Sequence, residues 1–436
     1  LFQDGSLDVL VLFSSTSTVT GPAGQIDYVA ANEFLNAYSK SRAGGKTRVI
    51  ALNWGIWAGV GMAAEALADR AGVPPAPRLP MSAPMLDEAG FDAAGNRVFT
   101  ASYGVDRWVL DGHRTKAGQA LVPGTGSLEI AAEALRAQGE AGAFELRDVY
   151  FFRPLDVADG EARAVRARLV RTDEGYDFDL RSAVAVQGRT GWQLHAQARA
   201  IPVQGQPVKI DVQAIAARLP AAELGDGLRS PQEEHLAFGP RWRVLRSRSI
   251  GGGEGLARLA LPAEFAGEVK DWLLHPALMD LATGWAMELI AGYRPDHLWV
   301  PVSYARIRVL RPLPAEIVSW VRNAGENRAS DATASFDVTL ATPDGEVCVE
   351  IEGFSIHKLE GALAFAKPDP RELEFDEVAP RPTSPAEERL LHAFSLGIKP
   401  EEGAQAFGRA VAAGGSQIIV SSLDLPALIR QTAEAE

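Results

Sequence analysis

The apolar positions in residues 1–72 alternate between strand and helix patterns. Residues 7–14 and 47–55 are nearly continuous apolar runs, which is typical of strands buried on both faces of a sheet. A helical pattern over about residues 25–42 lies between them. Strand, helix and strand at this spacing predict a βαβ unit of a parallel sheet. The Pro-rich residues 73–85 that follow predict a linker.

Residues 86–366 have a different pattern, in which short alternating strands dominate. Two helical stretches interrupt them, at 124–138 and 275–291, and each is followed by long antiparallel strands. Two copies of one helix wrapped by an antiparallel sheet form the double hot-dog fold. We therefore expect a first hot-dog at 86–210 and a second at 225–362.

The C-terminal residues return to the α/β pattern of the first 72. An acidic, Pro-rich stretch at 367–388 predicts a second linker, and residues 389–436 contain a helical pattern followed by the apolar run 416–422. This run has no other parallel strand near it in sequence, so its one compatible partner is the strand at 47–55. A long insertion costs little loop entropy when its ends are close together. The expected fold class is therefore α+β, with a double hot-dog inserted in a partial Rossmann-like domain.

The composition restricts the classes of partner that the protein can bind. The 436 residues contain 43 basic and 56 acidic side chains, a net charge of −13, which disfavours nucleic acid and anionic membranes. Cys348 is the single cysteine, so no internal disulfide can form. The chain shows neither an apolar run long enough for a membrane span nor a signal-peptide pattern at its start. We expect a cytoplasmic protein.

The strongest chemical candidates are a histidine and an aspartate. His113 precedes a Gly-rich turn, and Pro123 and Gly124 then open a helix, whose backbone N–H groups could hold a thioester carbonyl. Asp280 lies in an apolar helical run, where desolvation favours its protonated form. A neutral base and a protonated acid are what elimination of water requires. Each residue alone has a structural alternative, a core histidine and a helix-capping aspartate.

Four segments, in order, resemble the motifs of bacterial modular polyketide synthase dehydratases. They are the His-Gly-Pro motif around His113, a Gly-Pro-aromatic motif at 233–245, the Asp motif LMDLATG, and the Pro-x-x-Tyr motif VPVSY at 300–304. The resemblance implies that His113 is the base and Asp280 the acid. It also implies a set of substrate-binding residues: Gly118, Pro123, Gly124, Phe238, Gly239, Pro240, Trp242, Gly284, Pro301 and Tyr304.

The same resemblance implies a reaction and partners. It predicts syn elimination of water from a (3R)-hydroxyacyl group on the phosphopantetheine arm of an acyl carrier protein, with no cofactor and no metal. The expected partners are that carrier, the remaining domains of the synthase module and a second copy of the chain in a homodimer.

Two departures from the family motif affect the site. Four residues separate His113 from Gly118, where the family usually has three. Gly284 stands one helical turn after Asp280, where the family usually has Gln or His. We expect the missing side chain to leave an unoccupied volume or a water beside Asp280.

Residues 13–34 resemble the active-site stretch of polyketide synthase ketoreductases. Ser15, Tyr28 and Asn32 match the catalytic Ser, Tyr and Asn of that family, and residues 51–63 match the segment that follows. The Gly-rich nucleotide turn and the catalytic Lys of that family lie upstream of this stretch. We therefore expect these residues to be inactive in this fragment, with NADPH bound only if the missing ketoreductase part is present.

Two alternatives to simple dehydration remain open. A dehydratase-like domain could also close an oxygen heterocycle or shift the double bond, and space beside Asp280 at Gly284 would favour this. A catalytically silent structural domain is the other, although the presence of both His113 and Asp280 argues against it. The remaining histidines are scattered without metal-ligand spacing.

Overall fold

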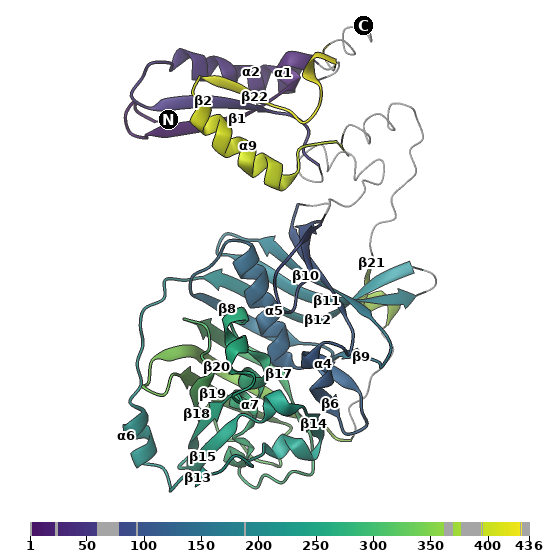
Figure 1. Ribbon diagram of the computed structural model, residues 1–436, viewed down its shortest axis with the longest axis vertical. Coiled ribbons are helices and arrows are strands. Elements are labelled where there is room, and N and C mark those ends of the chain that lie inside the picture. The colour runs from purple at the N-terminus through teal and green to yellow at the C-terminus, as the bar shows by residue number, and fades with distance from the viewer. Residues whose placement is uncertain are drawn as a thin grey trace. The chain divides into compact units, whose positions relative to one another are not determined.

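The computed structural model describes residues 2–21, 25–58, 78–92, 95–186, 189–361, 369–375, 394, 396–427 and 429 (Figure 1). The chain divides into two compact units. The α/β unit combines the N-terminal residues with those after 376, and the β-rich unit holds most of the residues between them.

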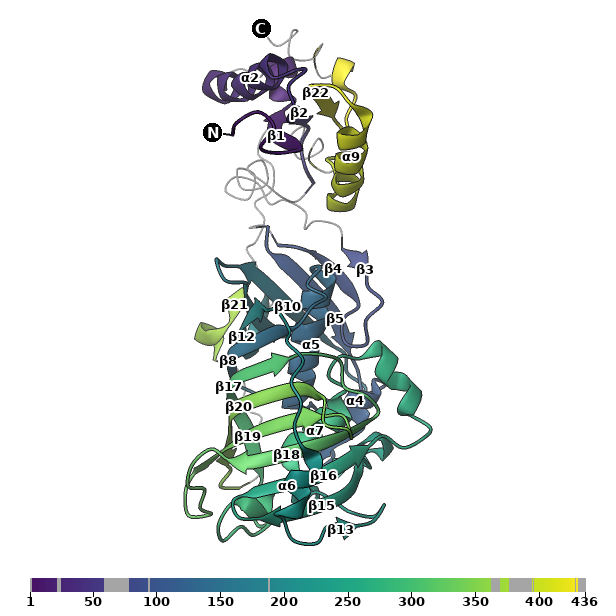
Figure 2. The ribbon, with the colours of Figure 1, turned by 90° about the vertical axis from the view of Figure 1, so that its left-hand side faces the viewer.

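The α/β unit is a three-stranded parallel sheet in the order β1-β2-β22. Helices α2 and α9 lie on opposite sides of this sheet in both views (Figures 1 and 2). The expected pairing across more than three hundred residues is present, with Leu52 opposite Ile418. The elements are β1 (Val9–Ser15), α1 (Ser17–Thr20), α2 (Ile26–Ser41), β2 (Arg48–Trp54), α9 (Pro400–Ala413) and β22 (Gln417–Val420).

The central strand β2 carries the core of this unit because it has neighbours on both edges. Ile50 and Leu52 are fully buried, and the Ser39 hydroxyl of α2 donates to the carbonyl of Val49 at 3.0 Å. On the other side, Gly403 of α9 lies directly against the indole of Trp57, where a Cβ atom would come within 2.1 Å of the ring. Glycine at 403 thus permits the close approach of helix and sheet.

The β-rich unit is dominated by one continuous sheet in the order β13-β15-β16-β18-β19-β20-β17-β8-β12-β11-β10-β5-β4-β3. Figure 2 shows these strands wrapping two helices, α5 (Gly124–Ala137) and α7 (Pro276–Gly284). The first half contains β3 (Leu79–Pro80), β4 (Glu88–Phe91), β5 (Arg97–Tyr103), β8 (Phe144–Phe151), β10 (Arg163–Arg171), β11 (Tyr176–Val186) and β12 (Arg189–Pro202). The second contains β13 (Glu223–Leu224), β15 (Leu245–Gly251), β16 (Glu254–Ala260), β17 (Trp299–Val309), β18 (Glu316–Asn323), β19 (Thr333–Ala341) and β20 (Val347–Lys358).

Helix α5 is buried around most of its circumference, including two of its carboxylates. Glu129 accepts hydrogen bonds from the backbone N–H groups of Leu273 and Leu274, which lie just before α7, the first at 3.0 Å. Glu133 accepts from the N–H of Met85 at 3.0 Å. Buried carboxylates are tolerated only when such donors replace water. The two side chains therefore fasten segments far apart in sequence to the central helix.

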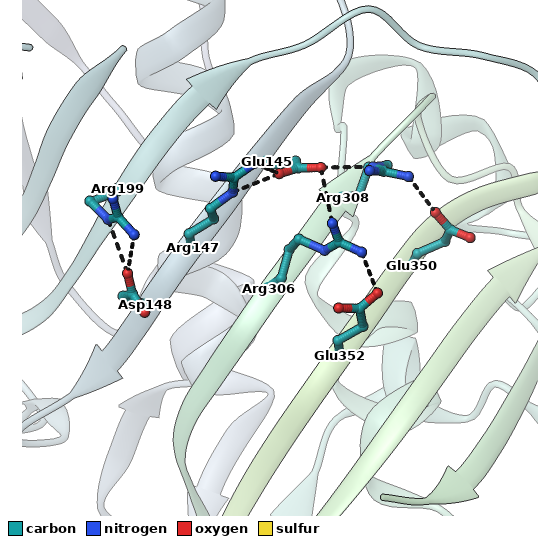
Figure 3. Close-up of polar contacts among 8 residues, drawn as sticks. All are labelled: Glu145, Arg147, Asp148, Arg199, Arg306, Arg308, Glu350 and Glu352. Carbon is teal, nitrogen blue, oxygen red and sulfur yellow. Dashed lines mark hydrogen bonds and ion pairs between the residues drawn. The ribbon is translucent and has the colours of Figure 1, made fainter. Parts of the chain in front are cut away.

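The two halves of the β-rich unit join where β17 pairs with β8 in antiparallel register. A cluster of charged side chains spans this seam (Figure 3). Glu145, whose side chain is only 2% exposed, accepts hydrogen bonds from Arg147 at 2.8 Å and from Arg308 at 2.9 Å. Arg308 also pairs with Glu350 at 3.3 Å. By contrast, the neighbouring pair of Arg199 and Asp148 is about half exposed.

Helix α7 is shorter than the predicted range of 275–291, because it ends at Gly284. Two side chains from elsewhere satisfy its last carbonyl groups, which would otherwise continue the helix. The Ser319 hydroxyl donates to the carbonyl of Ala282 at 2.7 Å, and the Ser230 hydroxyl donates to that of Gly284 at 2.9 Å. A short 3₁₀ turn, η4 (Met287–Leu289), follows.

Parts of the two expected linkers are integrated in the β-rich unit. Within 73–85, Leu79–Pro80 forms β3 and Met85 is only 1% exposed. Within 367–388, Pro370–Glu372 forms the 3₁₀ turn η5, and Glu374–Phe375 forms β21, which pairs with β12. Glu374 also pairs with Arg166 at 2.6 Å. The prediction of a linker is therefore wrong for residues 78–85 and for residues 369–375, which form part of the β-rich unit.

Candidate active site

His113 lies on a small antiparallel sheet in the order β14-β6-β7-β9. Its strands are β6 (His113–Thr115), β7 (Ala120–Val122), β9 (Leu155–Val157) and β14 (Leu236–Phe238). The imidazole is 7% exposed, and its Nδ1 lies 3.2 Å from the carbonyl oxygen of Leu121. A carbonyl can only accept, so Nδ1 carries the hydrogen and donates it. In the neutral ring, Nε2 therefore has a free lone pair.

The Nε2 atom of His113 faces Asp280, which α7 contributes from the second half. The distance from Nε2 to Oδ2 of Asp280 is 3.7 Å, and the aspartate side chain is 23% exposed. Oδ2 also accepts a hydrogen bond of 2.8 Å from Nε1 of Trp242. Since Oδ2 is the acceptor, the proton of a neutral Asp280 would lie on Oδ1.

Burial shifts both titrating groups toward their neutral forms. It lowers the pKa of His113, although the nearby Asp280 charge opposes the shift. It raises the pKa of Asp280, against the effects of His113 and of the Trp242 N–H. These are the directions expected from the apolar surroundings of both residues. The pair can therefore exist as an unprotonated base beside a protonated acid.

One segment, residues 230–243, touches both members of the pair; we call it the strap. Its start is fastened to the end of α7 by Ser230, and its strand β14 pairs with β6, with Phe238 opposite His113. Its last turn, η2 (Pro240–Trp242), carries the indole that binds Asp280. The strap thus connects the two halves at the place where the acid and the base meet.

Two glycines allow the strap to approach the histidine strand. The N–H of Gly239 donates to the carbonyl of Gly112 at 2.8 Å. A Cβ atom on Gly239 would lie 2.8 Å from the Gly112 Cα, and one on Gly112 would lie 2.6 Å from the Trp242 ring. Real side chains do not tolerate such distances, so both positions require glycine. Gly112 was not among the predicted site residues, although it directly precedes His113.

Aromatic and hydroxyl groups line the surroundings of the pair. Phe238 stacks on His113 with ring centroids 5.5 Å apart, and on Trp242 at 6.0 Å. Tyr304 of β17 is 1% exposed, yet its hydroxyl has no hydrogen-bond partner among the described residues. Burial and the Asp280 charge raise the pKa of this tyrosine. The hydroxyl of Thr125, in the first turn of α5, is likewise buried and unpaired within the described chain.

The other predicted substrate-binding residues occupy different environments. Pro123 is buried at the N-cap of α5, and Gly124 follows it, close enough to Pro301 of β17 that a Cβ would lie 3.0 Å from the proline ring. Gly118 lies in the exposed turn between β6 and β7, at a φ of +92° that favours glycine. Pro240 is also exposed. The longer spacing from His113 to Gly118 thus accommodates a hairpin turn.

The expectation of an unoccupied volume or a water at Gly284 stays a prediction. A Cβ atom on this glycine would lie 3.4 Å from Nε2 of Gln232, an ordinary van der Waals distance, so the side chain of Gln232 borders the position without filling it. The strap reaches it because Ser230 is bonded to the Gly284 carbonyl. Nothing in the sequence pointed to Gln232, which lies on a short 3₁₀ turn, η1 (Pro231–Glu234), far from Asp280 along the chain.

In the α/β unit, the three matched ketoreductase positions lie at the end of β1 and on α2. The Asn32 carboxamide donates to the backbone carbonyl of Tyr28 at 2.9 Å, and the Ser15 hydroxyl accepts from the N–H of Ser17 at 3.1 Å. Within the described residues no hydrogen bond joins the side chains of Ser15, Tyr28 and Asn32 to one another.

Comparison with protein families agrees with this arrangement. A family model for the polyketide synthase dehydratase domain matches residues 83–183, and one for the polyketide synthase dehydratase N-terminal domain matches 208–364. A model for the KR domain matches residues 1–59. The chain therefore contains a polyketide synthase dehydratase domain. A ketoreductase fragment precedes it.

Relatives of this dehydratase chain are polyketide synthases. The chain is 24% identical over 264 residues to polyketide synthase PksM of Bacillus subtilis. This match covers 56% of the chain and 6% of the relative. It is 32% identical over 271 residues to the spectinabilin polyketide synthase system protein NorB of Streptomyces orinoci, covering 56% and 12%. The chain thus spans only a small part of the length of these relatives.

Solved dehydratase domains share the fold of the β-rich unit. One is the dehydratase domain of a trans-AT polyketide synthase from Brevibacillus brevis, with a TM-score of 0.57, 20% identity and coverage of 65% of this chain and all of that one. Another is the dehydratase domain from the CurF module of curacin polyketide synthase, with a TM-score of 0.56, 24% identity and coverage of 64% and 100%. These neighbours establish the double hot-dog.

The described residues offer neither a membrane span nor a metal site. They contain no helix that is both long and apolar enough to cross a membrane. They also contain no group of three His, Cys, Asp or Glu side chains placed to bind a metal ion.

Proposed function

We propose that the dehydratase domain removes water from a 3-hydroxyacyl thioester, with His113 as the base and Asp280 as the acid. The observation that carries this proposal is the lone pair of His113 Nε2, which faces the Asp280 carboxyl group at 3.7 Å. Burial moves the pKa of each group toward the protonation state that elimination needs.

The elimination divides the proton transfers between these two groups. Nε2 of His113 removes a proton from C2 of the acyl chain, and the electron pair of that C–H bond forms the C2–C3 double bond. The C3–O bond breaks, and the proton of Asp280 passes to the departing oxygen, which leaves as water. The imidazolium and carboxylate that remain lie within reach of each other, so a proton returned from His113 to Asp280 restores the starting pair.

The first turn of α5 supports the developing charge on the thioester oxygen. This turn begins shortly after Leu121, whose carbonyl holds His113, and so lies on the side of the base. N–H groups at a helix N-terminus are free to donate and carry a partial positive charge. The unpaired hydroxyls of Thr125 and Tyr304 are further donors without partners in the described chain. They support a role in binding a polar group of the substrate.

The acyl group is proposed to arrive on the phosphopantetheine arm of an acyl carrier protein. The relatives are much longer polyketide synthases, which supports delivery from another part of such a synthase. We also propose a homodimer and contact with the other domains of the module. Binding energy from the carrier would raise catalytic efficiency, so carrier-bound substrate should be preferred over the free pantetheine thioester. Equal kcat/KM values for the two forms would contradict carrier recognition.

We infer that the C-terminal residues 389–436 belong to the same reductase-type unit as the ketoreductase fragment. The support is the parallel pairing of β22 with β2. The chemistry of elimination needs no redox cofactor, so NADPH would concern only a ketoreductase completed by residues upstream of this fragment.

The function is tested by incubating the full chain with a 3-hydroxyacyl pantetheine thioester and following loss of water by mass spectrometry. His113→Ala and Asp280→Asn should each reduce turnover by about 10²- to 10⁴-fold. The matched controls are His297→Ala and Asp296→Asn, since these two residues form an exposed pair, 2.8 Å apart, on the surface. Near-wild-type turnover in either site variant would refute the assignment. A curacin synthase dehydratase domain of this fold has been solved as two inactive mutants, one His to Phe and one Asp to Asn.

A further inference from the structure

A carboxamide from the strap lies on the face of α7 that carries Asp280. Residues four apart on a helix share a face, so Gly284 follows Asp280 by one turn on the same side. Nε2 of Gln232 lies 3.4 Å from the position where a side chain of Gly284 would begin. The helix itself supplies no side chain there, and among the described residues outside the backbone of α7 and the chain neighbours of Gly284, the one atom within 4 Å of this position belongs to Gln232.

The backbone of Gln232 is fixed by its neighbours. Ser230 caps the 3₁₀ turn by accepting a hydrogen bond from the Gln232 N–H at 3.3 Å, and its own hydroxyl binds the Gly284 carbonyl at 2.9 Å. Glu233 completes a capping box and is itself held by Arg243. The turn therefore presents Gln232 to the end of α7 in a defined position.

The polar end of Gln232 is nevertheless unused. The side chain is partly buried, and its carboxamide forms no hydrogen bond with any residue that the structure describes. The same holds for Oδ1 of Asp280, because Trp242 and His113 both face Oδ2. Both side chains are partly exposed, so both polar groups are accessible to a ligand. Two unused groups on one helix face can share a single ligand atom that hydrogen-bonds to both.

We propose that Gln232 donates a hydrogen bond to the 3-hydroxyl oxygen of the substrate and holds it for protonation by Asp280. This inference rests on the proposed function and names a binding residue for it. The amide N–H fits the oxygen both as a hydroxyl and as departing water, since each retains a lone pair. Gln232 would thus recognise substrates that carry the leaving group and discriminate against acyl chains that lack it.

The test compares binding of two thioesters to the full chain carrying His113→Ala, in which the hydroxyl compound is not consumed. The probes are 3-hydroxybutyryl pantetheine and butyryl pantetheine, which differ only in the hydroxyl group. In a second variant, Gln232→Met is added to His113→Ala, which keeps the side-chain size at position 232 and removes the amide N–H donor. The preference for the hydroxyl compound, measured as a ratio of Kd values, should fall about 10-fold, with the Kd of butyryl pantetheine unchanged.

Kinetics with His113 intact provide the second measurement. Gln232→Met should lower kcat by about 10- to 100-fold and leave the pH dependence unshifted, because Asp280 keeps its Trp242 partner. The control is Glu234→Gln, because Glu234 is an exposed residue of the same turn, and this variant should keep the wild-type kcat. An unchanged Kd ratio, an equal loss for both thioesters, or a shifted pH profile would each overturn the proposal. In those cases wild-type turnover and its loss in Asp280→Asn would still uphold the dehydratase function, so the two failures are distinguishable.

Discussion

The indole N–H of Trp242 donates a 2.8 Å hydrogen bond to Oδ2 of Asp280. This bond favours the charged carboxylate and so opposes the rise in the pKa of Asp280 that burial causes. It also fixes which oxygen holds the proton when the group is neutral. Trp242 therefore moderates the rise in the pKa of Asp280 and fixes the orientation of the proposed acid.

Removing this donor should shift the pH profile of dehydration. In Trp242→Phe the pKa of Asp280 should rise further, because a hydrogen bond to its charged form is lost. Since Asp280 must be protonated to act, it controls the alkaline limb of the pH profile of kcat/KM. This limb should move upward by about one pH unit. Trp285→Phe is the matched control, because the Trp285 indole donates at 3.1 Å to Ser319 instead. A profile that does not move in Trp242→Phe, or that moves equally in the control, would contradict this role.

The buried Glu133 should make folding less favourable as the pH rises. Burial raises its pKa to about 9 from an ordinary value of 4.5, so the folded chain holds a proton that the unfolded chain has lost between these values. Its contribution to stability is fully present below about pH 4.5 and is lost as the pH rises toward 9. Thermal unfolding between pH 5 and 9 measures this.

Glu133→Gln imitates the protonated acid and should flatten that decline, giving a higher Tm than wild type at pH 8. Glu161→Gln, an exposed change, should leave the decline in place. Glu129, whose pKa burial raises to about 7, adds a decline of the same sign at lower pH. Identical pH dependence in wild type and Glu133→Gln would show that Glu133 does not carry the effect.

Two glycines of α9 should respond to alanine with opposite signs. At Gly403 a methyl group would overlap the Trp57 ring, so Gly403→Ala should destabilise the α/β unit. At Gly408 nothing lies within 4 Å, so alanine should stabilise the helix by about 1 kcal/mol. Hydrogen exchange in β2 reports both changes, because this strand is the core of the unit. Equal effects at the two positions would contradict the packing of α9 on Trp57.

The seam between the two halves should depend on Glu145 much more than on its exposed neighbour. Glu145→Gln leaves Arg147 and Arg308 facing an uncharged group at a buried position, and should cost about 2–3 kcal/mol. Asp148→Asn breaks an exposed pair and should cost no more than about 1 kcal/mol. Asparagine also tolerates the positive φ of 50° at this residue. Urea unfolding, followed by hydrogen exchange in β8 and β17, compares the two variants, and similar losses would refute the ranking.

The sequence was sufficient for the features that depend on periodicity and on local motifs. The apolar runs at 47–55 and 416–422 predicted parallel strands, and their pairing follows because a parallel strand needs a neighbour. Only β2 is buried as expected, whereas β22 is a partly exposed edge strand. His113 and Asp280 were recognisable because each sits in a motif of distinctive local sequence, and the structure brings them together. The pKa direction of Asp280 also followed, since its apolar neighbours were visible in the sequence, whereas the burial that lowers the pKa of His113 was not.

Features that depend on contacts distant in sequence were not predictable in this way. The helix at 275–291 was expected to be longer because its residues remain apolar beyond Gly284, whereas Ser230 and Ser319 terminate it from other segments. Gln232 lies on an irregular turn that has no periodic signal. The Pro-rich residues near Met85 and Glu374 looked like linkers because proline composition does not reveal burial or strand pairing.

The strap has a consequence for constructing hybrid enzymes. Between Ser230 and Trp242 it is attached to the acid helix at both ends and to the histidine strand in the middle. Its length therefore fixes the spacing of the two groups, so an inserted or deleted residue would do more harm than most substitutions. In a hybrid that exchanges the first half of the domain between two relatives, the junction should be placed before Ser230. The strap and α7, to which it is hydrogen-bonded, then come from the same relative.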